Sequence, residues 1–198
     1  MKPRRYAIAM LALAGTVLWG QGAWIHVKAQ LGQTLLHQAW SKHQLTGQRV
    51  APWPWADTWP VARLRSSRVK TDQLVLAHAS GRNLAWGPTH VAPSALPGRN
   101  GHSIISGHRD THFRFLAELQ VGDTLDLENL AGKVSYEVVA TEIIDLRVEP
   151  VMLEPEQARL SLVTCYPFDA ISANTRASKL PPGPGPIPGR WRVCAPGG

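Results

Sequence analysis

The chain has 198 residues, a formal net charge of +7 at pH 7, 16 prolines and 17 glycines. This length suits one domain that buries its own core, together with an N-terminal appendage. The proline and glycine content favours a β-rich domain with many loops over a helical bundle. The basic residues are scattered and do not alternate with aromatic residues, so nothing indicates a nucleic-acid partner.

The N-terminal segment has the composition of a membrane anchor. Residues 6–25 contain no charged residue, and as a helix they would be about 30 Å long, the thickness of the hydrocarbon core of a bilayer. Residues 1–5 carry three basic side chains and are predicted to remain as a cytoplasmic basic tail. We therefore predict a single-pass anchor in the inner (cytoplasmic) membrane, with the rest of the chain on the periplasmic side. The alternative is a cleaved signal peptide, with Gly20 and Gly22 close to the cleavage point.

Residues 26–50 have a helical pattern of apolar side chains. Four apolar residues recur every four positions, with two more beside them and polar residues between: Val27, Leu31, Leu35 and Ala39, with Leu36 and Trp40. This spacing predicts an amphipathic stalk helix that packs on the domain or lies along the membrane surface.

The next segment, residues 51–60, is rich in tryptophan and proline. Its three prolines prevent a helix, and Trp53, Trp55 and Trp59 are too many for a free linker. We expect the segment to pack against the domain at residues 51–198 and to close its entry. A ligand groove built on the tryptophans is the alternative.

The rest of the domain reads as a series of short strands. Eight apolar runs bounded by turn residues predict a mainly β fold, either a barrel or a sandwich. Short helices are expected around Phe113–Leu119 and after Glu154-Pro155, because proline is tolerated in a first helical turn. The predicted strands are Val61–Leu64, Gln73–His78, Leu84–Gly87, His102–Ser106, Thr124–Leu127, Val134–Ile144, Arg159–Thr164 and Trp191–Cys194.

Cys165 and His108 each stand where a predicted strand stops. Pro167 ends regular pairing just after Cys165, so the thiol is expected at the rim of the sheet, where reactive thiols occur. His108 follows the strand that runs into Gly107. A cysteine nucleophile needs an imidazole that activates the thiol and moves protons, so these two residues form a candidate catalytic pair.

Arg190 begins the last predicted strand. If that strand runs antiparallel to the strand that ends at Cys165, the guanidinium lies beside the thiol and is able to stabilise a developing oxyanion. The 25-residue stretch from Cys165 to Arg190 contains the proline-rich run Pro181–Pro188. Arg176 lies in the same stretch and is the alternative cation.

Other assignments of these side chains remain open. Cys165 as a buried structural thiol, and a disulfide between Cys165 and Cys194, are alternatives to a free nucleophile. His102, His108 and His112 lack the accompanying cysteines or carboxylates of a tetrahedral zinc site. No metal and no cofactor is therefore expected.

These segments resemble the sortase family. Residues 160–165 (Leu-Ser-Leu-Val-Thr-Cys) are similar to its T-L-x-T-C strand, with Ser161 at the usual threonine. Residues 106–110 (Ser-Gly-His-Arg-Asp) and 189–193 (Gly-Arg-Trp-Arg-Val) are similar to its histidine and arginine segments. Residues 53–60, 86–90 and 108–113 resemble the proteobacterial, or marine, subgroup. The resemblance runs from about Val50 to Val193.

The resemblance implies an eight-stranded sortase β-barrel and a reaction. It implies that the thiolate of Cys165 attacks the threonine carbonyl of an LPxTG-like C-terminal sorting signal on a surface protein. His108 then protonates the leaving amine, and an amine acceptor in the cell envelope resolves the thioester. Arg190 would position the substrate and stabilise the oxyanion. Thr164 and Asp110 are the expected substrate-binding residues. Asp110 is also expected to order the His108 loop, unless it is only an exposed turn carboxylate.

Two other functions fit the same residues. A cysteine peptidase would let water resolve the thioester and release the substrate by hydrolysis. A non-catalytic, membrane-tethered binding barrel would leave Cys165 inert and use the tryptophan segment for recognition.

Overall fold

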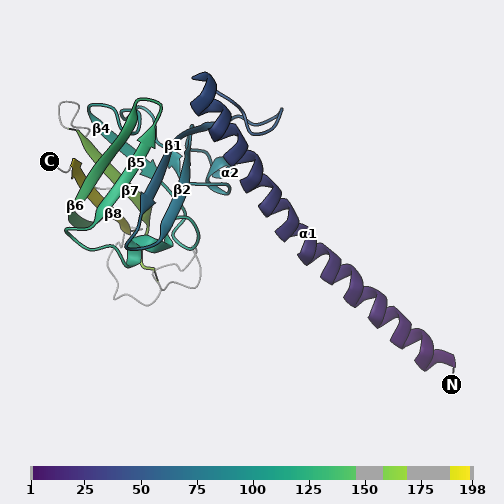
Figure 1. Ribbon diagram of the computed structural model, residues 1–198. Coiled ribbons are helices and arrows are strands. Elements are labelled where there is room, and N and C mark those ends of the chain that lie inside the picture. The colour runs from purple at the N-terminus through teal and green to yellow at the C-terminus, as the bar shows by residue number, and fades with distance from the viewer. Residues whose placement is uncertain (1, 146–157, 169–187, 197–198) are drawn as a thin grey trace, which may run out of the picture.

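The computed structural model describes residues 2–145, 158–168 and 188–196 (Figure 1). Eight strands close into a barrel in the order β1-β2-β3-β4-β7-β8-β6-β5, and β1 completes the circle by pairing with β5. This confirms the predicted mainly β barrel. The strands are β1 Pro60–Ser66, β2 Thr71–Leu76, β3 Thr89–His90, β4 His102–Ser106, β5 Thr124–Asn129, β6 Gly132–Asp145, β7 Arg159–Cys165 and β8 Pro188–Pro196.

Most neighbouring strands of the barrel are antiparallel, but two pairs are parallel. These are β2 with β3, and β4 with β7. Parallel strands have their carboxyl ends at the same edge of a sheet. The pair β4–β7 therefore brings together the two chain segments in which a reactive histidine and cysteine were predicted.

Alternation of side chains along the strands builds the barrel core. In β1, buried and half-exposed residues alternate along the strand, and Ala62 and Leu64 are fully buried, as expected for a strand with one face inward. Leu160 and Leu162 of β7 enter the same core cluster. Phe113, beside the short 3-10 helix η1 Arg114–Ala117, is also buried there. A helix predicted at Phe113–Leu119 is thus present as a single 3-10 turn.

The strand predicted at Leu84–Gly87 is wrong. Residues Gly81–Leu84 form the short helix α2, which begins where the Ser80 side chain accepts a hydrogen bond from the Asn83 amide. The Asn83 side chain donates to the carbonyl of His78, so local polar contacts outweigh the apolar pattern. The helix predicted after Glu154-Pro155 lies outside the described residues.

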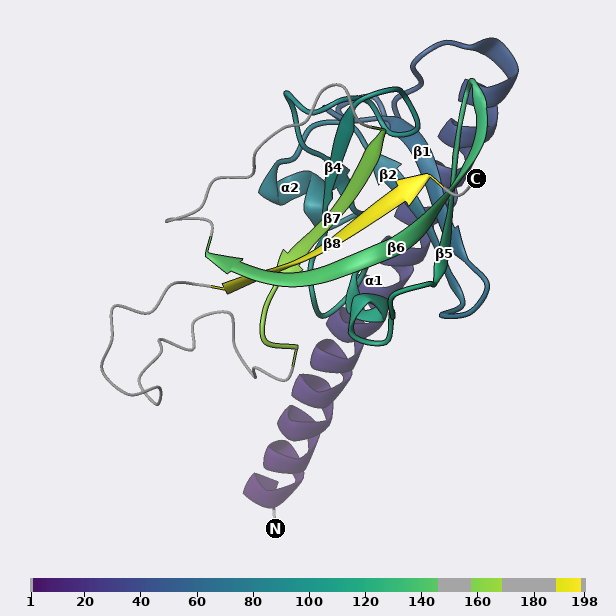
Figure 2. The ribbon, with the colours of Figure 1, turned by 90° about the vertical axis from the view of Figure 1, so that its left-hand side faces the viewer.

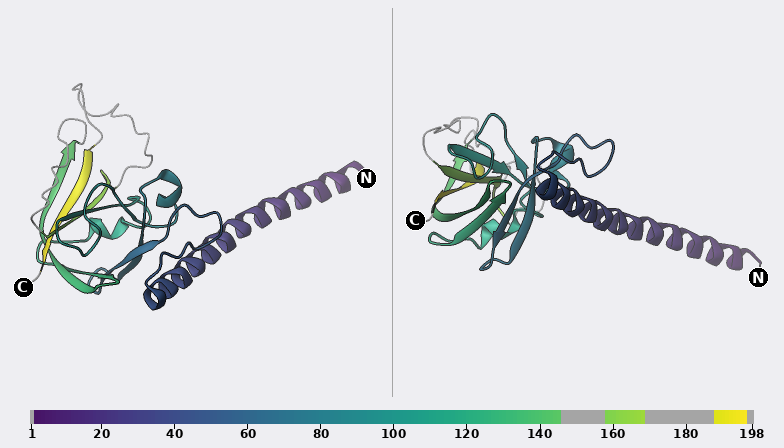
Figure 3. Two further views of the ribbon diagram at one scale, coloured as in Figure 1. Left: turned by 90° about the horizontal axis from the view of Figure 1, so that it is seen from above. Right: turned by 45° about the horizontal axis from the view of Figure 1, so that its top comes forward.

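A single helix, α1 Lys2–Thr46, precedes the barrel and projects from one side of it (Figure 3). Its N-terminal part is exposed. Among the helices in the described part of the chain, α1 alone is long enough and apolar enough to cross a membrane. The segment predicted as a stalk helix thus continues the apolar N-terminal helix without a break. It ends at Thr46 rather than at residue 50, because Gly47, with φ +70°, caps it through a bond from its amide to the His43 carbonyl.

The C-terminal part of α1 packs on the barrel. Leu36 and Trp40 are buried against Leu74 and Leu76 of β2. Ala39 of the predicted face is buried as well, whereas Val27 and Leu31, nearer the N-terminus, are more than half exposed. The helix approaches closely at Gly32, where a Cβ would lie 2.2 Å from the Trp86 ring.

Candidate active site

Cys165 is the last residue of β7, and its side chain is an exposed free thiol. The alternation along β7 explains this position, because Leu162 and Thr164 are buried while Cys165 follows on the other face. The register of β8 places Cys194 opposite Leu160, at the other end of β7. The backbones of the two cysteines are therefore roughly 16 Å apart, far beyond the reach of a disulfide.

Strands β4 and β7 run side by side in parallel (Figure 2), so the segments that carry His108 and Cys165 leave the sheet at the same edge. The ladder pairs Ser106 with Val163, and the Gly107 amide extends it by donating to the Val163 carbonyl at 3.0 Å. His108 and Cys165 each follow the last paired residues, Ser106 and Val163, by two positions. Both side chains are exposed, so the imidazole and the thiol stand at the same edge of the barrel.

The backbone on which His108 stands is fixed by hydrogen bonds from both sides. The Thr164 hydroxyl is buried and donates to the Gly107 carbonyl at 2.8 Å. The Phe113 amide donates to the His108 carbonyl at 3.0 Å. A Cβ at Gly107 would lie 2.7 Å from the buried Phe113 ring, so only glycine fits there without displacing the core.

Arg109 ties the His108 loop to the chain that follows Cys165. Its side chain is only 6% exposed. Two of its nitrogens, Nε and Nη2, donate to the Asp110 carboxylate at 2.7 and 3.2 Å, and Nη1 donates to the Pro167 carbonyl. A buried guanidinium thus joins the residue after His108 to a residue two positions beyond Cys165.

Two ionisable neighbours of His108 have shifted pKa values. The hydrogen bond from Arg109 lowers the pKa of Asp110, and the nearby charges of Arg109, His108 and Arg114 act in the same direction. Burial lowers the pKa of His112 below its ordinary value of 6.5, and the charge of His108 adds to this. Asp110 is therefore held ionised and His112 neutral beside His108.

Strand β8 pairs antiparallel with β7, as the sequence argument required for Arg190. The residue directly opposite Cys165 is Gly189, and Arg190 is opposite Thr164. The backbone of Arg190 is therefore next to the Cys165 end of β7, one position away from direct register with the cysteine. Arg176 and residues 181–187 lie outside the described residues.

The predicted substrate contacts differ in their surroundings. Asp110 is exposed beside His108 and bound to Arg109. Thr164 is 4% exposed, with its hydroxyl already bonded to Gly107. Sequence reasoning missed Arg109 and Gly107. Their position next to His108 was the only available signal, since their partners are distant in the chain.

The tryptophan segment lies away from this site. Trp53 contacts Trp86 with ring centroids 5.0 Å apart, under helix α1. Trp59 contacts His78 edge to face, while Trp55 is 80% exposed. The segment therefore packs against the barrel, as expected.

A sequence model described as the Sortase domain matches residues 64–178, more than half of the chain. The chain belongs to the sortase family. It is 35% identical to Sortase D of Bacillus subtilis (strain 168) over 109 residues, which are 54% of this chain and 55% of that protein. The alignment thus spans about half the length of this curated relative.

Solved sortase structures share the fold. The chain aligns with a Clostridium perfringens Sortase D5 transpeptidase with a TM-score of 0.62 and 16% identity, covering 85% of this chain and 99% of that one. Sortase A from Corynebacterium diphtheriae aligns with a TM-score of 0.57 and 17% identity, over 73% and 63% of the two chains. A lid mutant of Streptococcus agalactiae Sortase C1 gives 0.57 and 19%, over 70% of each chain.

Proposed function

We propose that this protein is a membrane-anchored cysteine transpeptidase that cleaves an LPxTG-like C-terminal sorting signal and transfers the acyl group to an amine. The observation that carries the proposal is the parallel register of β4 and β7, which brings the segments of His108 and of the exposed thiol of Cys165 to the same edge of the barrel. Membership of the sortase family supports the same chemistry.

In the proposed reaction the Cys165 thiolate attacks the threonine carbonyl of the sorting signal. The tetrahedral intermediate collapses to a thioester, and the imidazolium of His108 gives a proton to the departing amine. The incoming amine then attacks the thioester, His108 takes back a proton, and the thiolate is released. Arg190 is proposed to stabilise the oxyanion and position the substrate.

The groups that hold the pair in place follow from the contacts. Two hydrogen bonds connect the His108 loop to the chain on either side of Cys165. Thr164, just before Cys165, donates to the Gly107 carbonyl, and Arg109 donates to the carbonyl of Pro167, just after it. Because the Thr164 hydroxyl is buried, we propose that it acts by positioning this loop. Asp110 is proposed to act through Arg109 and through its negative charge beside His108.

The proposed organisation places residues 1–5 in the cytoplasm, residues 6–25 in the inner membrane and the barrel on the periplasmic side. The exposed apolar N-terminal part of α1 supports this arrangement. The continuous helix would hold the barrel clear of the bilayer, since about 10 Å of helix separates residue 25 from Gly32, which approaches the Trp86 ring.

The test is product analysis with an amine nucleophile. Purified full-length protein in detergent is incubated with a sorting-signal peptide, with and without an added amine such as triglycine. We expect a ligated product that increases with the amine and is absent in Cys165→Ala. Release of the free acid alone, at every amine concentration, would instead identify a peptidase.

A thiol probe separates both enzymes from a binding barrel. Iodoacetamide should label Cys165 faster in the wild type than in His108→Ala, because the imidazole promotes the thiolate. Equal labelling rates in the two proteins would show that the thiol is not activated by His108.

A further inference from the structure

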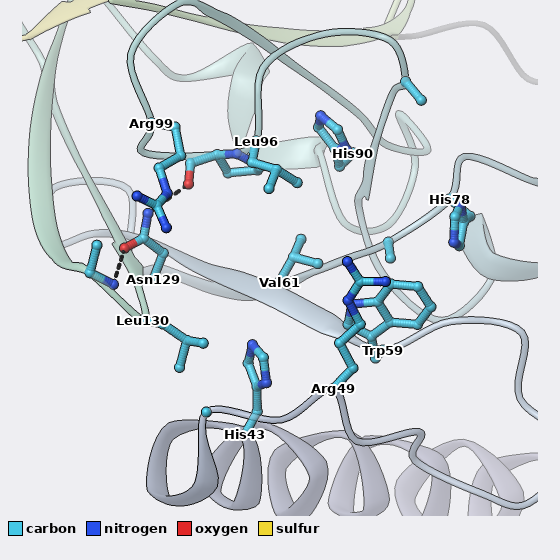
Figure 4. A pocket seen from close by; sticks show the side chains of 15 residues that line it. His43, Arg49, Trp59, Val61, His78, His90, Leu96, Arg99, Asn129 and Leu130 are labelled. Atoms are coloured by element: carbon cyan, nitrogen blue, oxygen red, sulfur yellow. Dashed lines mark hydrogen bonds between the residues drawn. The ribbon is translucent and has the colours of Figure 1, made fainter.

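A cavity of about 420 Å³ lies apart from Cys165 (Figure 4). It is lined by the end of α1, the start of β1, the loop after β3 and the turn between β5 and β6. The end of β8 connects this turn to the start of β7. Pro196 of β8 pairs with Tyr136, near the start of β6, and Cys194 of β8 pairs with Leu160, near the start of β7. The turn is therefore at the barrel end where β7 begins. Cys165 is at the opposite end of β7, so the cavity is separate from the proposed active site.

The described lining of the cavity combines apolar side chains with cations. Val61, Leu96, Leu130 and the Trp59 ring supply the apolar surface. The charged residues among the described lining are Arg49 and Arg99, and no carboxylate is among them. The cavity therefore favours a ligand with an apolar body and a negative charge.

These two arginines differ from those in β1 and in the turn that follows it. Arg63, Arg65 and Arg68 each form an ion pair with a carboxylate. Within the described parts of the chain, no ion pair is formed by Arg49 or Arg99. The guanidinium of Arg49 instead lies 4.9 Å from the centre of the Trp59 ring, which leaves its hydrogen-bond donors available to a ligand.

The wall that carries Arg99 is held in a fixed position. The Asn129 side chain donates to the Pro97 carbonyl and accepts from the Ala131 amide. Gly98, with φ +77°, packs so closely that a Cβ would lie 2.5 Å from the Asn129 amide nitrogen. A cavity with such walls is preformed, which lowers the entropic cost of binding.

Hydrogen bonds hold a histidine on each side of the cavity. On the α1 side, His43 shares a hydrogen bond with the Gln48 carbonyl. On the side of Leu96, His90 bonds the carbonyls of Ser94 and Ala95 at 3.1 and 3.0 Å. Figure 4 shows Arg49 and His43 on one side of the cavity, with Leu96 and Arg99 across from them.

We propose that this cavity is a second binding site, for an aromatic or aliphatic group that ends in a carboxylate. Its volume is within the range of small-molecule sites, roughly 300–1,000 Å³. Arg49 and Arg99 bind the carboxylate, and Trp59 with its apolar neighbours takes the body of the ligand. The site uses the tryptophan segment, which the proposed reaction at Cys165 leaves unused.

The test compares N-acetyl-tryptophan with N-acetyl-tryptophanamide, which share one aromatic body and differ in charge. Affinities for the detergent-solubilised full-length protein are measured by ligand-observed NMR at low salt. We expect the acid to bind about tenfold more tightly than the amide, the effect of one charge-assisted contact. The preference should weaken in 0.5 M NaCl because salt screens the guanidinium charges.

A double variant, Arg49→Gln with Arg99→Gln, should remove the preference for the acid. The matched control, Arg63→Gln with Arg68→Gln, loses the same net charge away from the cavity and should keep it. Equal affinity for acid and amide, no binding of either, or loss of the preference in the control would overturn the proposal.

Two further arms complete the test. The carboxylate of a peptide ligand can come from its C-terminus or from an acidic side chain. Two tryptophan dipeptides distinguish these sources: one has a free C-terminal carboxylate, and the other has an aspartate side chain and an amidated end. Tighter binding of either one supports the site. Cys165→Ala should keep the preference in full, so this test and the test of the proposed reaction can fail separately.

Discussion

The guanidinium of Arg109 donates a hydrogen bond to the carbonyl of Pro167. It thereby joins the residue after His108 to the segment after Cys165, across 58 positions of the chain. Because Arg109 is buried and also held by Asp110, this link fixes the relative position of the two loops on which the proposed reaction depends.

Arg109→Gln should therefore lower kcat while leaving KM nearly unchanged. A shift of about 1 Å between two catalytic groups costs roughly 100-fold in rate, so we expect a loss of 10- to 100-fold. Arg109→Lys should recover only part of the rate, because lysine lacks the planar fork that reaches two partners.

Steady-state kinetics with a fluorogenic sorting peptide, recorded from pH 5 to 9, measure this effect. Arg114→Gln is the matched control, since Arg114 is an exposed arginine at the start of η1, just after the His108 loop. A purely structural role for Arg109 would lower the melting temperature and the active fraction but leave the pH profile of the remaining activity unchanged.

Cys165→Ala should abolish cleavage without unfolding the barrel. The side chain is exposed at the end of β7, so its removal leaves no cavity, and the free energy of unfolding should change by less than about 0.5 kcal/mol. Peptide cleavage followed by mass spectrometry and thermal unfolding by circular dichroism measure the two effects. Cleavage by the variant would exclude Cys165 as the nucleophile.

Arg190→Ala should lose far more activity than Arg176→Ala. The backbone of Arg190 is opposite Thr164, next to the cysteine end of β7, and removal of an oxyanion donor costs about 100- to 1,000-fold in kcat. Both variants are compared by kcat on the same peptide, after their melting temperatures are shown to match. Equal losses would leave the strand alignment without a role in catalysis.

Thr164→Val should destabilise the protein, because it deletes the hydroxyl that donates to Gly107 and leaves a buried carbonyl without that bond. The expected cost is about 1 to 2 kcal/mol of unfolding free energy, measured by urea denaturation. Thr164→Ser keeps the donor and should keep most of this energy. A Val variant as stable as the wild type, with the loss confined to Thr164→Ser, would show that the methyl group and not the hydroxyl supplies the energy.

Stability should fall with acidity through His112. Burial lowers the pKa of His112 in the folded state below 6.5, so the unfolded chain binds the proton more readily and the unfolding free energy rises with pH. The contribution is complete above about pH 6.5 and is lost as the pH falls toward the folded-state pKa. Chemical denaturation between pH 7.5 and 5 should show a steeper decline for the wild type than for His112→Gln, and parallel curves would contradict this origin.

The sequence predicted the strands that carry the candidate site with good accuracy. The predicted strand His102–Ser106 has the bounds of β4, and Arg159–Thr164 falls one residue short of β7. These segments combine a dense apolar pattern with a clear stop, at Gly107 and at Pro167 respectively. The strand predicted at Leu84–Gly87 failed because an apolar run of four residues does not reveal the Ser80 cap or the buried Asn83.

By itself, the sequence determined the mainly β class, the apolar N-terminal helix and the positions of Cys165 and His108 at strand ends. These are properties of local composition, periodicity and proline or glycine stops, which a reader finds without knowing any contact. The family followed from three short motifs in the right order.

Only the tertiary structure decided which strands are neighbours. The parallel pairing of β4 with β7, the bond from Arg109 to Pro167 and the cavity lined by Arg49 and Arg99 each join segments between about 50 and 60 residues apart in the chain. Such contacts depend on the closure of the barrel, whose energy is shared among all eight strands, and no local pattern of residues encodes them.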